Sequence, residues 1–245
     1  MTDLTQLRAT LDEIDRGIHD LLLRRADVVA DIGAQKKGTD APRLRPGREA
    51  AILRRLLARH HGPLAPATIV RIWREIFAGS LALQGPLRVA LAAPGLAPLA
   101  REHFGALVPL TTAASPQAAL AALAAGEADA ALIDADTDAW SLLPEIHPDL
   151  SIAAWLPIWR PRPEGGPTGQ AFLVTPHFPD ASGADQTLVA LRPPGAPPAL
   201  PGQSAAPRQA ANGWCLAEMP SHLTSLPPGL PCPARLIGAY ALPIA

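Results

Sequence analysis

Five polar side chains interrupt the apolar faces of three predicted helices in the first 85 residues: Arg25, Lys36, Glu49, Ser80 and Gln84. Arg25 takes a heptad position that is otherwise apolar, and Lys36 follows 11 residues later, a rotation of only about 20° around a helix. Glu49 precedes the apolar face of the second helix, and in the third helix Ser80 and Gln84 follow Trp73 and Phe77 and have the same i, i+4 spacing. Each helix therefore directs polar groups toward a common interior.

Arg25 and Lys36 together predict a site for an anion. Burying two cations without partners costs on the order of several kcal/mol each, and Glu49 alone cannot offset both. Lys36 and Lys37 are the two lysines among 21 basic residues, which favours a compact ammonium donor at this position. The alternative interpretation is a coiled coil that uses buried polar residues to fix its register or oligomeric state.

The elements that must position these groups are one long helix and two shorter ones. Apolar residues at heptad spacing predict an amphipathic helix over about residues 4–37. The row consists of Leu4, Leu7, Leu11, Ile14, Ile18, Leu21, Val28 and Ile32. A second helix is expected over residues 49–61, and a third from Pro66 to Gly85. One exposed apolar seam of this length predicts a partner chain, and we expect a homodimer.

Composition divides the 245-residue chain near Pro86 into two predicted domains, 1–85 and 86–245. The first holds 14 basic residues, 10 acidic residues and four prolines, whereas the second holds 7 basic residues, 12 acidic residues and 25 prolines. This density of proline excludes long helices from much of the second domain. A net charge of −1 and a pI near 6.6 argue against broad nucleic-acid or membrane-surface binding. The start of the chain lacks the bases of a signal peptide, and we expect a soluble cytoplasmic protein.

The spacing LR-x6-D-x9-R-x10-K, followed by RPGREA, GPL and S-x3-Q, resembles the all-helical class of chorismate mutase over residues 4–85. The resemblance implies an intertwined homodimer with two equivalent sites, in which chorismate rearranges to prephenate in phenylalanine and tyrosine biosynthesis. By this resemblance Arg25 holds one substrate carboxylate with Ser80 nearby, and the partner chain's Arg8 holds the other. Arg8 lies about 260° around the helix from Arg25, so the two residues cannot share a face.

The same resemblance implies catalytic roles for three further residues. Lys36 and Gln84 would donate hydrogen bonds to the ether oxygen of chorismate, and Glu49 would accept one from the ring hydroxyl. A [3,3] pericyclic rearrangement needs no nucleophile, metal or cofactor, and none is expected. Its barrier falls when the substrate is held in a folded conformer and fixed donors meet the negative charge that develops on the ether oxygen. Arg48 would add positive potential, and Arg45 is given no role.

Two other functions are compatible with these residues. The same helical fold supports isochorismate-pyruvate lyase activity, although a dehydratase-like second half argues against it. The other alternative is a non-catalytic dimer that binds an aromatic-pathway metabolite. Measuring which product is released from chorismate separates the three.

Residues 86–245 resemble a prephenate dehydratase domain in outline, as in the bifunctional chorismate mutase–prephenate dehydratase. The segment AALAALAAGEADAALIDADTD follows the family's order of helix, strand and loop, and its loop reads Asp134, Ala135, Asp136, Thr137 and Asp138. Gln170 and Ala171 stand where that family has a catalytic Thr followed by Arg. Three aspartates would repel a dianionic substrate, and the acid-donating hydroxyl is absent. We therefore expect an α/β domain without dehydratase activity.

Overall fold

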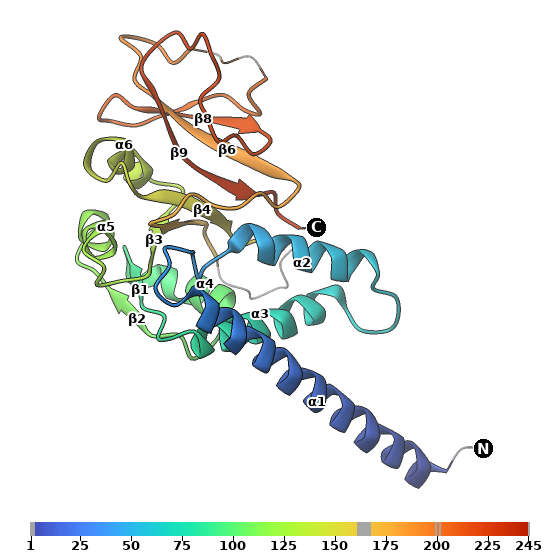
Figure 1. Ribbon diagram of the computed structural model, residues 1–245. Helices are drawn as coiled ribbons and strands as arrows, with labels where there is room; N and C mark the ends of the chain where they lie inside the picture. Colours follow the sequence, from blue (N-terminus) through green and yellow to red (C-terminus); the bar gives the residue numbers. More distant parts are fainter. Residues whose placement is uncertain (1–2, 161–167, 199, 201, 245) are drawn as a thin grey trace. The chain divides into compact units, whose positions relative to one another are not determined.

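The computed structural model describes residues 3–160, 168–198, 200 and 202–244, and its helices and strands are shown in Figure 1. The chain forms two compact units: Met1–Arg43 with Gly79–Pro86, and Leu44–Ala78 with Leu87–Ala245. The chain leaves the first unit for the last time at Pro86, where the sequence predicts a boundary, but residues 44–78 pack with the later part of the chain. Independent folding of residues 1–85 and 86–245 stays a prediction.

The first unit is built on α1, Leu4–Lys36, which Figure 1 shows as one unbroken helix. Asp3 caps its N-terminus by accepting a hydrogen bond from the Thr5 backbone N–H at 3.4 Å. The helix buries none of its residues in the single chain. The eight residues of its heptad row are 41% to 66% exposed. The sequence thus predicted this helix correctly, and its apolar face is uncovered.

The second unit contains α2, Pro46–Ala58, and most of α3, Pro66–Leu83. A proline at the first helical position begins each helix, where its missing N–H has no intrahelical partner to lose. The second helix thus begins at Pro46, a position at which a helix N-terminus tolerates proline, and it ends at Ala58, three residues before the end of the expected range 49–61. The last turn of α3, from Gly79 on, belongs to the first unit.

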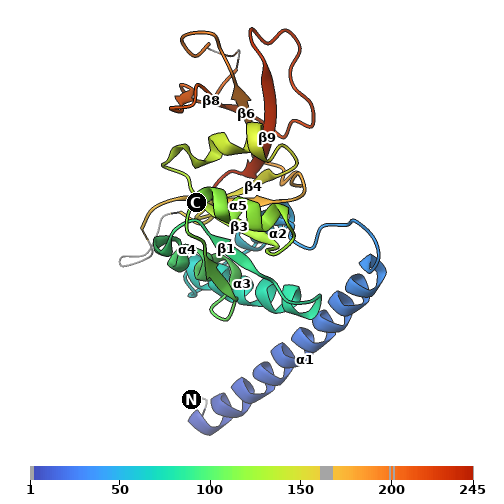
Figure 2. The same cartoon turned by 90° about the vertical axis from the view of Figure 1, so that its left-hand side faces the viewer.

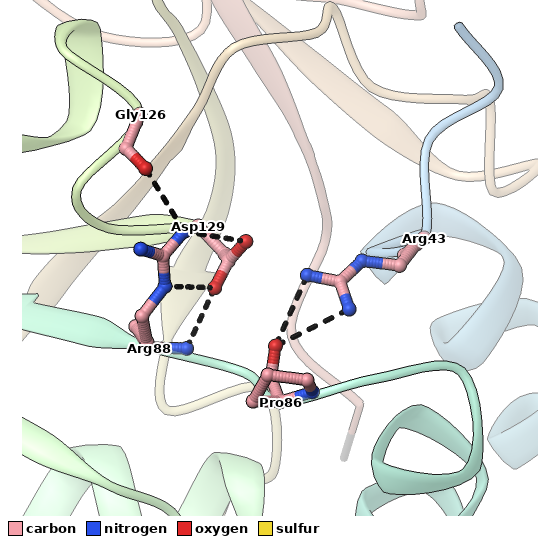
Figure 3. Close-up of polar contacts among 5 residues, drawn as sticks. All are labelled: Arg43, Pro86, Arg88, Gly126 and Asp129. Carbon is pink, nitrogen blue, oxygen red and sulfur yellow. Dashed lines mark hydrogen bonds and ion pairs between the residues drawn. The ribbon is translucent and has the colours of Figure 1, made fainter. Parts of the chain in front are cut away.

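The last of the three points at which the chain passes between the two units follows α3, and the residues on each side of it are hydrogen-bonded within their own unit. In the first unit, both terminal nitrogens of Arg43 donate to the Pro86 carbonyl oxygen at 3.2 Å (Figure 3). In the second unit, Arg88 Nε donates to Asp129 Oδ2 at 3.2 Å and its Nη2 to the Gly126 carbonyl oxygen at 2.9 Å (Figure 3). The Arg88 backbone N–H donates to the same carboxylate at 2.8 Å.

A mixed sheet completes the second unit, with the strand order β2-β1-β3-β5-β4-β9-β6-β8-β7 among the described residues. The strands are β1 Val89–Leu91, β2 Leu110–Thr112, β3 Ala130–Asp134, β4 Ser151–Leu156, β5 Ala171–Thr175, β6 Asp185–Leu191, β7 Arg208–Gln209, β8 Cys215–Pro220 and β9 Ala234–Ala241. The short helices are η1 Pro94–Leu96, α4 Ala97–Phe104, α5 Pro116–Ala124, η2 Asp138–Leu142 and α6 Leu143–Ile146. β1 pairs in parallel with β2 and β3, and β4 in parallel with β9, whereas the other pairs are antiparallel.

The start of the sheet follows from simple local rules. Ser115 caps α5 by accepting from the Ala118 backbone N–H at 3.2 Å, and Pro116 takes the first helical position. β3 is an apolar run that buries four of its five residues, as parallel strands covered on both faces do. α5 packs against β1 and β3, which Figure 2 shows from the side. The predicted class, helices followed by an α/β domain, is confirmed.

No helix in the described part of the chain is both long enough and apolar enough to cross a membrane.

Candidate active site

Arg25 and Ser80 meet in the first unit, although 55 residues separate them in the sequence. Arg25 Nη1, from α1, donates a hydrogen bond to the Ser80 hydroxyl oxygen in the last turns of α3. Both side chains are half-buried. A guanidinium offers five N–H donors in a planar fork, and a hydroxyl beside it supplies one more. This pair of donors suits a carboxylate ligand.

Gln84 lies one turn beyond Ser80 and belongs to the same group. Its side-chain Nε2 donates to the Ser80 backbone carbonyl oxygen at 3.1 Å. On the α1 side, a Cβ placed on Gly33 would lie 3.2 Å from Gln84 Cγ, so this glycine gives the glutamine side chain its space. Gly33 was not predicted from the sequence, because a lone glycine within a helical pattern carries no further signal.

Lys36 is the last residue of α1, on the face that Arg25 occupies. Its ammonium donates to the Pro42 carbonyl oxygen at 2.7 Å, in the segment that follows the helix. Lys37, the next residue, is exposed and caps the helix with its backbone N–H. The half-buried lysine is therefore positioned by the end of α1, whereas its neighbour faces solvent.

Arg8 is exposed near the start of α1. It lies 17 residues before Arg25, which is about 25 Å along the helix axis at 1.5 Å per residue. Arg8 and Arg25 of one chain are thus too far apart to hold the same small molecule.

Glu49 lies in the second unit, where it forms a buried ion pair with Arg74 of α3. Arg74 Nη1 is 2.7 Å from Glu49 Oε2, and the two side chains are 6% and 13% exposed. Burial raises the pKa of Glu49, and the charge of Arg74 opposes this rise. A carboxylate has about four acceptor positions, so this bond does not exhaust its capacity.

Arg74 was not predicted from the sequence, although the helical spacing of Val70, Arg74, Phe77 and Leu81 could have indicated it. All four residues are buried on one stripe of α3. The predicted polar positions, Ser80 and Gln84, lie on a neighbouring stripe that leads from Phe77. Arg48, by contrast, is exposed on α2.

The aspartate-rich loop after β3 is bonded to the chain itself. Asp134 accepts from the Asp136 backbone N–H at 2.8 Å, and Asp138 from the Ala211 backbone N–H at 3.0 Å. Gln170, just before β5, accepts from Arg160 Nη2 at 2.8 Å. An amide is no general acid, so Gln170 cannot protonate a leaving hydroxyl at the predicted position.

Comparison with known proteins agrees with the group of candidate site residues in the first unit. The family model described as Chorismate mutase type II matches residues 7–85, a range that includes Arg8, Arg25, Lys36, Ser80 and Gln84. A bifunctional chorismate mutase/prephenate dehydratase from Stutzerimonas stutzeri is 36% identical over 110 residues, 42% of this chain and 30% of that protein. One from Pseudomonas aeruginosa is 34% identical over 131 residues, 50% of this chain and 36% of that protein.

The matched segments thus span about a third of the length of these relatives. Among solved structures, a prephenate dehydratase from Arthrobacter aurescens in complex with L-Phe aligns with 63% of this chain and 90% of its own. The TM-score is 0.42 at 15% identity. The resemblance of the helical region to chorismate mutase is confirmed by the family match.

Proposed function

We propose that this chain is a chorismate mutase, converting chorismate to prephenate by a [3,3] rearrangement at a site formed by its helices. The contact that carries the proposal is the one between the Arg25 guanidinium and the Ser80 hydroxyl, inside the segment that matches the mutase family. Together they would bind one carboxylate of chorismate. Charge-assisted hydrogen bonds to a carboxylate are about twice as strong as neutral ones, which suits an anchor.

Catalysis in this proposal is positional and electrostatic. No covalent intermediate with the protein is required, because one carbon–oxygen bond breaks while one carbon–carbon bond forms within the same bound molecule. Holding chorismate in its folded conformer removes the entropic cost of reaching it. Lys36 and Gln84 would donate to the ether oxygen, where negative charge develops as the carbon–oxygen bond breaks. The Pro42 carbonyl, which Lys36 contacts at 2.7 Å, would hold the ammonium in place for this task.

Glu49 would accept a hydrogen bond from the ring hydroxyl of chorismate. An ionised carboxylate accepts this hydrogen bond more strongly than the neutral acid does, and burial of Glu49 works against ionisation. Arg74 counteracts that effect through its charge and its hydrogen bond. Arg74 is therefore a positioning residue in the proposal, because it both orients Glu49 and favours its charged form.

The proposed assembly is a homodimer in which the partner chain supplies Arg8. The uncovered heptad row of α1 supports it, because eight large apolar side chains in one stripe would be buried by the same helix of a second copy. The separation of about 25 Å between Arg8 and Arg25 also supports it, since a second α1 running antiparallel would bring its Arg8 to the Arg25 end.

Mixing two inactive variants tests the shared site. Arg8→Ala and Arg25→Ala dimers should each lose most activity, because each removes one carboxylate anchor from both sites. After unfolding and refolding the two together, activity should return to about one quarter of wild type, since about half of the dimers are mixed and each has one intact site. Mock-refolded single variants are the control. Sites formed within one chain would give no recovery.

The product formed from chorismate tests the proposed activity itself. We expect prephenate, with no pyruvate and no phenylpyruvate at neutral pH, because Gln170 cannot protonate a leaving hydroxyl. Chromatography of a reaction stopped without acid measures all three compounds. Pyruvate would identify the lyase activity, unchanged chorismate would indicate the binding protein, and phenylpyruvate would contradict the interpretation of Gln170.

The setting that follows from the proposal is aromatic amino-acid biosynthesis, and we place the protein in the cytoplasm. The names of the two relatives support this setting, because both describe consecutive steps from chorismate. The proposed small-molecule ligand is chorismate, and we propose no binding to nucleic acid or to a membrane.

A further inference from the structure

Helix α2, which carries Glu49, packs onto the sheet of the second unit. Its apolar side is formed by Ala50 and Leu53, both fully buried, and the helix contacts β4 and β9. Leu53 lies one turn after Glu49, so the packed side and the proposed catalytic side chain adjoin. The orientation of α2 is therefore set by the C-terminal part of the chain.

Arg54 fixes the outer side of α2 to the same sheet. Its Nη1 donates to the Ser182 side-chain oxygen at 2.8 Å and to the Ser182 carbonyl oxygen at 3.3 Å. Its Nη2 donates to the carbonyl oxygens of Leu242, at 2.7 Å, and Ala184, at 3.1 Å. One guanidinium thus binds four oxygens from two segments that are 58 residues or more apart.

The oxygens that Arg54 binds are themselves rigidly held. Asp185, 7% exposed at the start of β6, accepts from the Ser182 backbone N–H at 2.9 Å and from its hydroxyl at 2.5 Å. The Leu242 backbone N–H donates to the Ala184 carbonyl oxygen at 2.8 Å, where β6 begins and β9 ends. Arg54 is therefore bonded to hydrogen-bonded segments at the start of β6 and the end of β9.

The first turn of α2 makes a second attachment to the neighbouring segment. Arg45 Nε is 2.6 Å from Asp180 Oδ2, and a Cβ on Gly47 would lie only 2.1 Å from the Asp180 carbonyl oxygen. Only glycine allows so close an approach of helix and chain. Because Arg45 and Asp180 are each 37% exposed, their ion pair contributes less than the bonds of Arg54.

We propose that the dehydratase-like domain is the support that positions α2 for the mutase reaction, with Arg54 as its main positioning residue. This inference rests on the proposed function, because Glu49 is the side chain whose position it explains. Arg54 lies on another face of α2 from Glu49 and acts through the helix. A displacement of about 1 Å at a catalytic group can cost about 10²-fold in rate, so a helix held at both ends matters to activity.

Full-length Arg54→Ala protein tests the inference, with Arg55→Ala as the matched control, since Arg55 is the exposed neighbour on the same helix. We expect Arg54→Ala to lower kcat by about tenfold or more with a smaller change in KM, whereas the control keeps wild-type values. Hydrogen–deuterium exchange should become faster in peptides that cover residues 46–58, and this readout needs no substrate.

Gly47→Ala is an independent second variant, because its methyl group would push α2 away from Asp180 without touching Arg54. We expect the same loss of kcat and the same faster exchange in this variant. It also tests the inference if Arg54→Ala does not fold. Normal kcat in both variants, whether or not exchange changes, would overturn the positioning role. Wild-type protein that leaves chorismate unchanged would instead overturn the proposed function, even where exchange responds as expected.

Discussion

Replacement of Lys36 by alanine is expected to lower kcat for the conversion of chorismate by about 10²–10³-fold, the usual effect of losing one donor to a developing oxyanion. The ammonium is needed most in the transition state, when the ether oxygen carries its largest negative charge. KM should change less than kcat, because the proposal assigns the binding of the carboxylates to arginine. Steady-state kinetics on the purified protein measure both constants.

Lys37→Ala is the matched control for this measurement. The two lysines are adjacent, but Lys36 is half-buried against the Pro42 carbonyl, whereas Lys37 is exposed. A general effect of charge near the end of α1 would lower kcat in both variants. Near-normal kcat in a folded, dimeric Lys36→Ala protein would remove Lys36 from the catalytic machinery.

The helical elements could be predicted from sequence because their signals are local. Heptad spacing predicted α1 within one residue of its end at Lys36, and the prolines at 46 and 66 indicate where α2 and α3 begin. Arg25 and Ser80 were recognised because polar residues on apolar stripes need a reason to be there. Their contact across 55 residues was expected only through the family resemblance, since spacing alone does not show which helices adjoin.

The attachment of α2 to the sheet could not be predicted in the same way. Arg54 contacts Ser182 and Leu242, which are 128 and 188 residues away, and nothing in a run of arginines shows which one has distant partners. Arg45 was given no role from the family resemblance, because some members carry Asp at its position, and its pairing with Asp180 was not predicted. The composition boundary at Pro86 separates two kinds of sequence, and a contact across such a boundary leaves no periodic pattern.

Exchanging Gln84 for glutamate is expected to lower kcat/KM by about 10³-fold at pH 7.5, because a carboxyl group that titrates near 4.3 is protonated in only about one molecule in 10³ there. An amide donates to the ether oxygen at any pH, whereas a carboxyl group donates only in its acid form. Activity of Gln84→Glu should therefore rise about tenfold for each pH unit toward acid. A pH series of kcat/KM for both proteins measures this difference.

The acid side of the pH profile separates the effect of the residue at position 84 from that of Glu49, which titrates in both proteins. In the proposal an ionised Glu49 accepts a charge-assisted hydrogen bond, which is stronger than the bond that the neutral acid would accept. Burial raises the pKa of Glu49, so wild-type activity should fall as the pH drops through that raised value. The variant's gain toward acid should stop at the same point, because Glu49 then becomes neutral in both proteins. The guanidinium groups stay charged across this range. Gln84→Ala, which has no group to titrate, should keep the wild-type profile at a lower level. A Gln84→Glu profile that only parallels the wild type would show that the residue at this position does not contact the reacting oxygen.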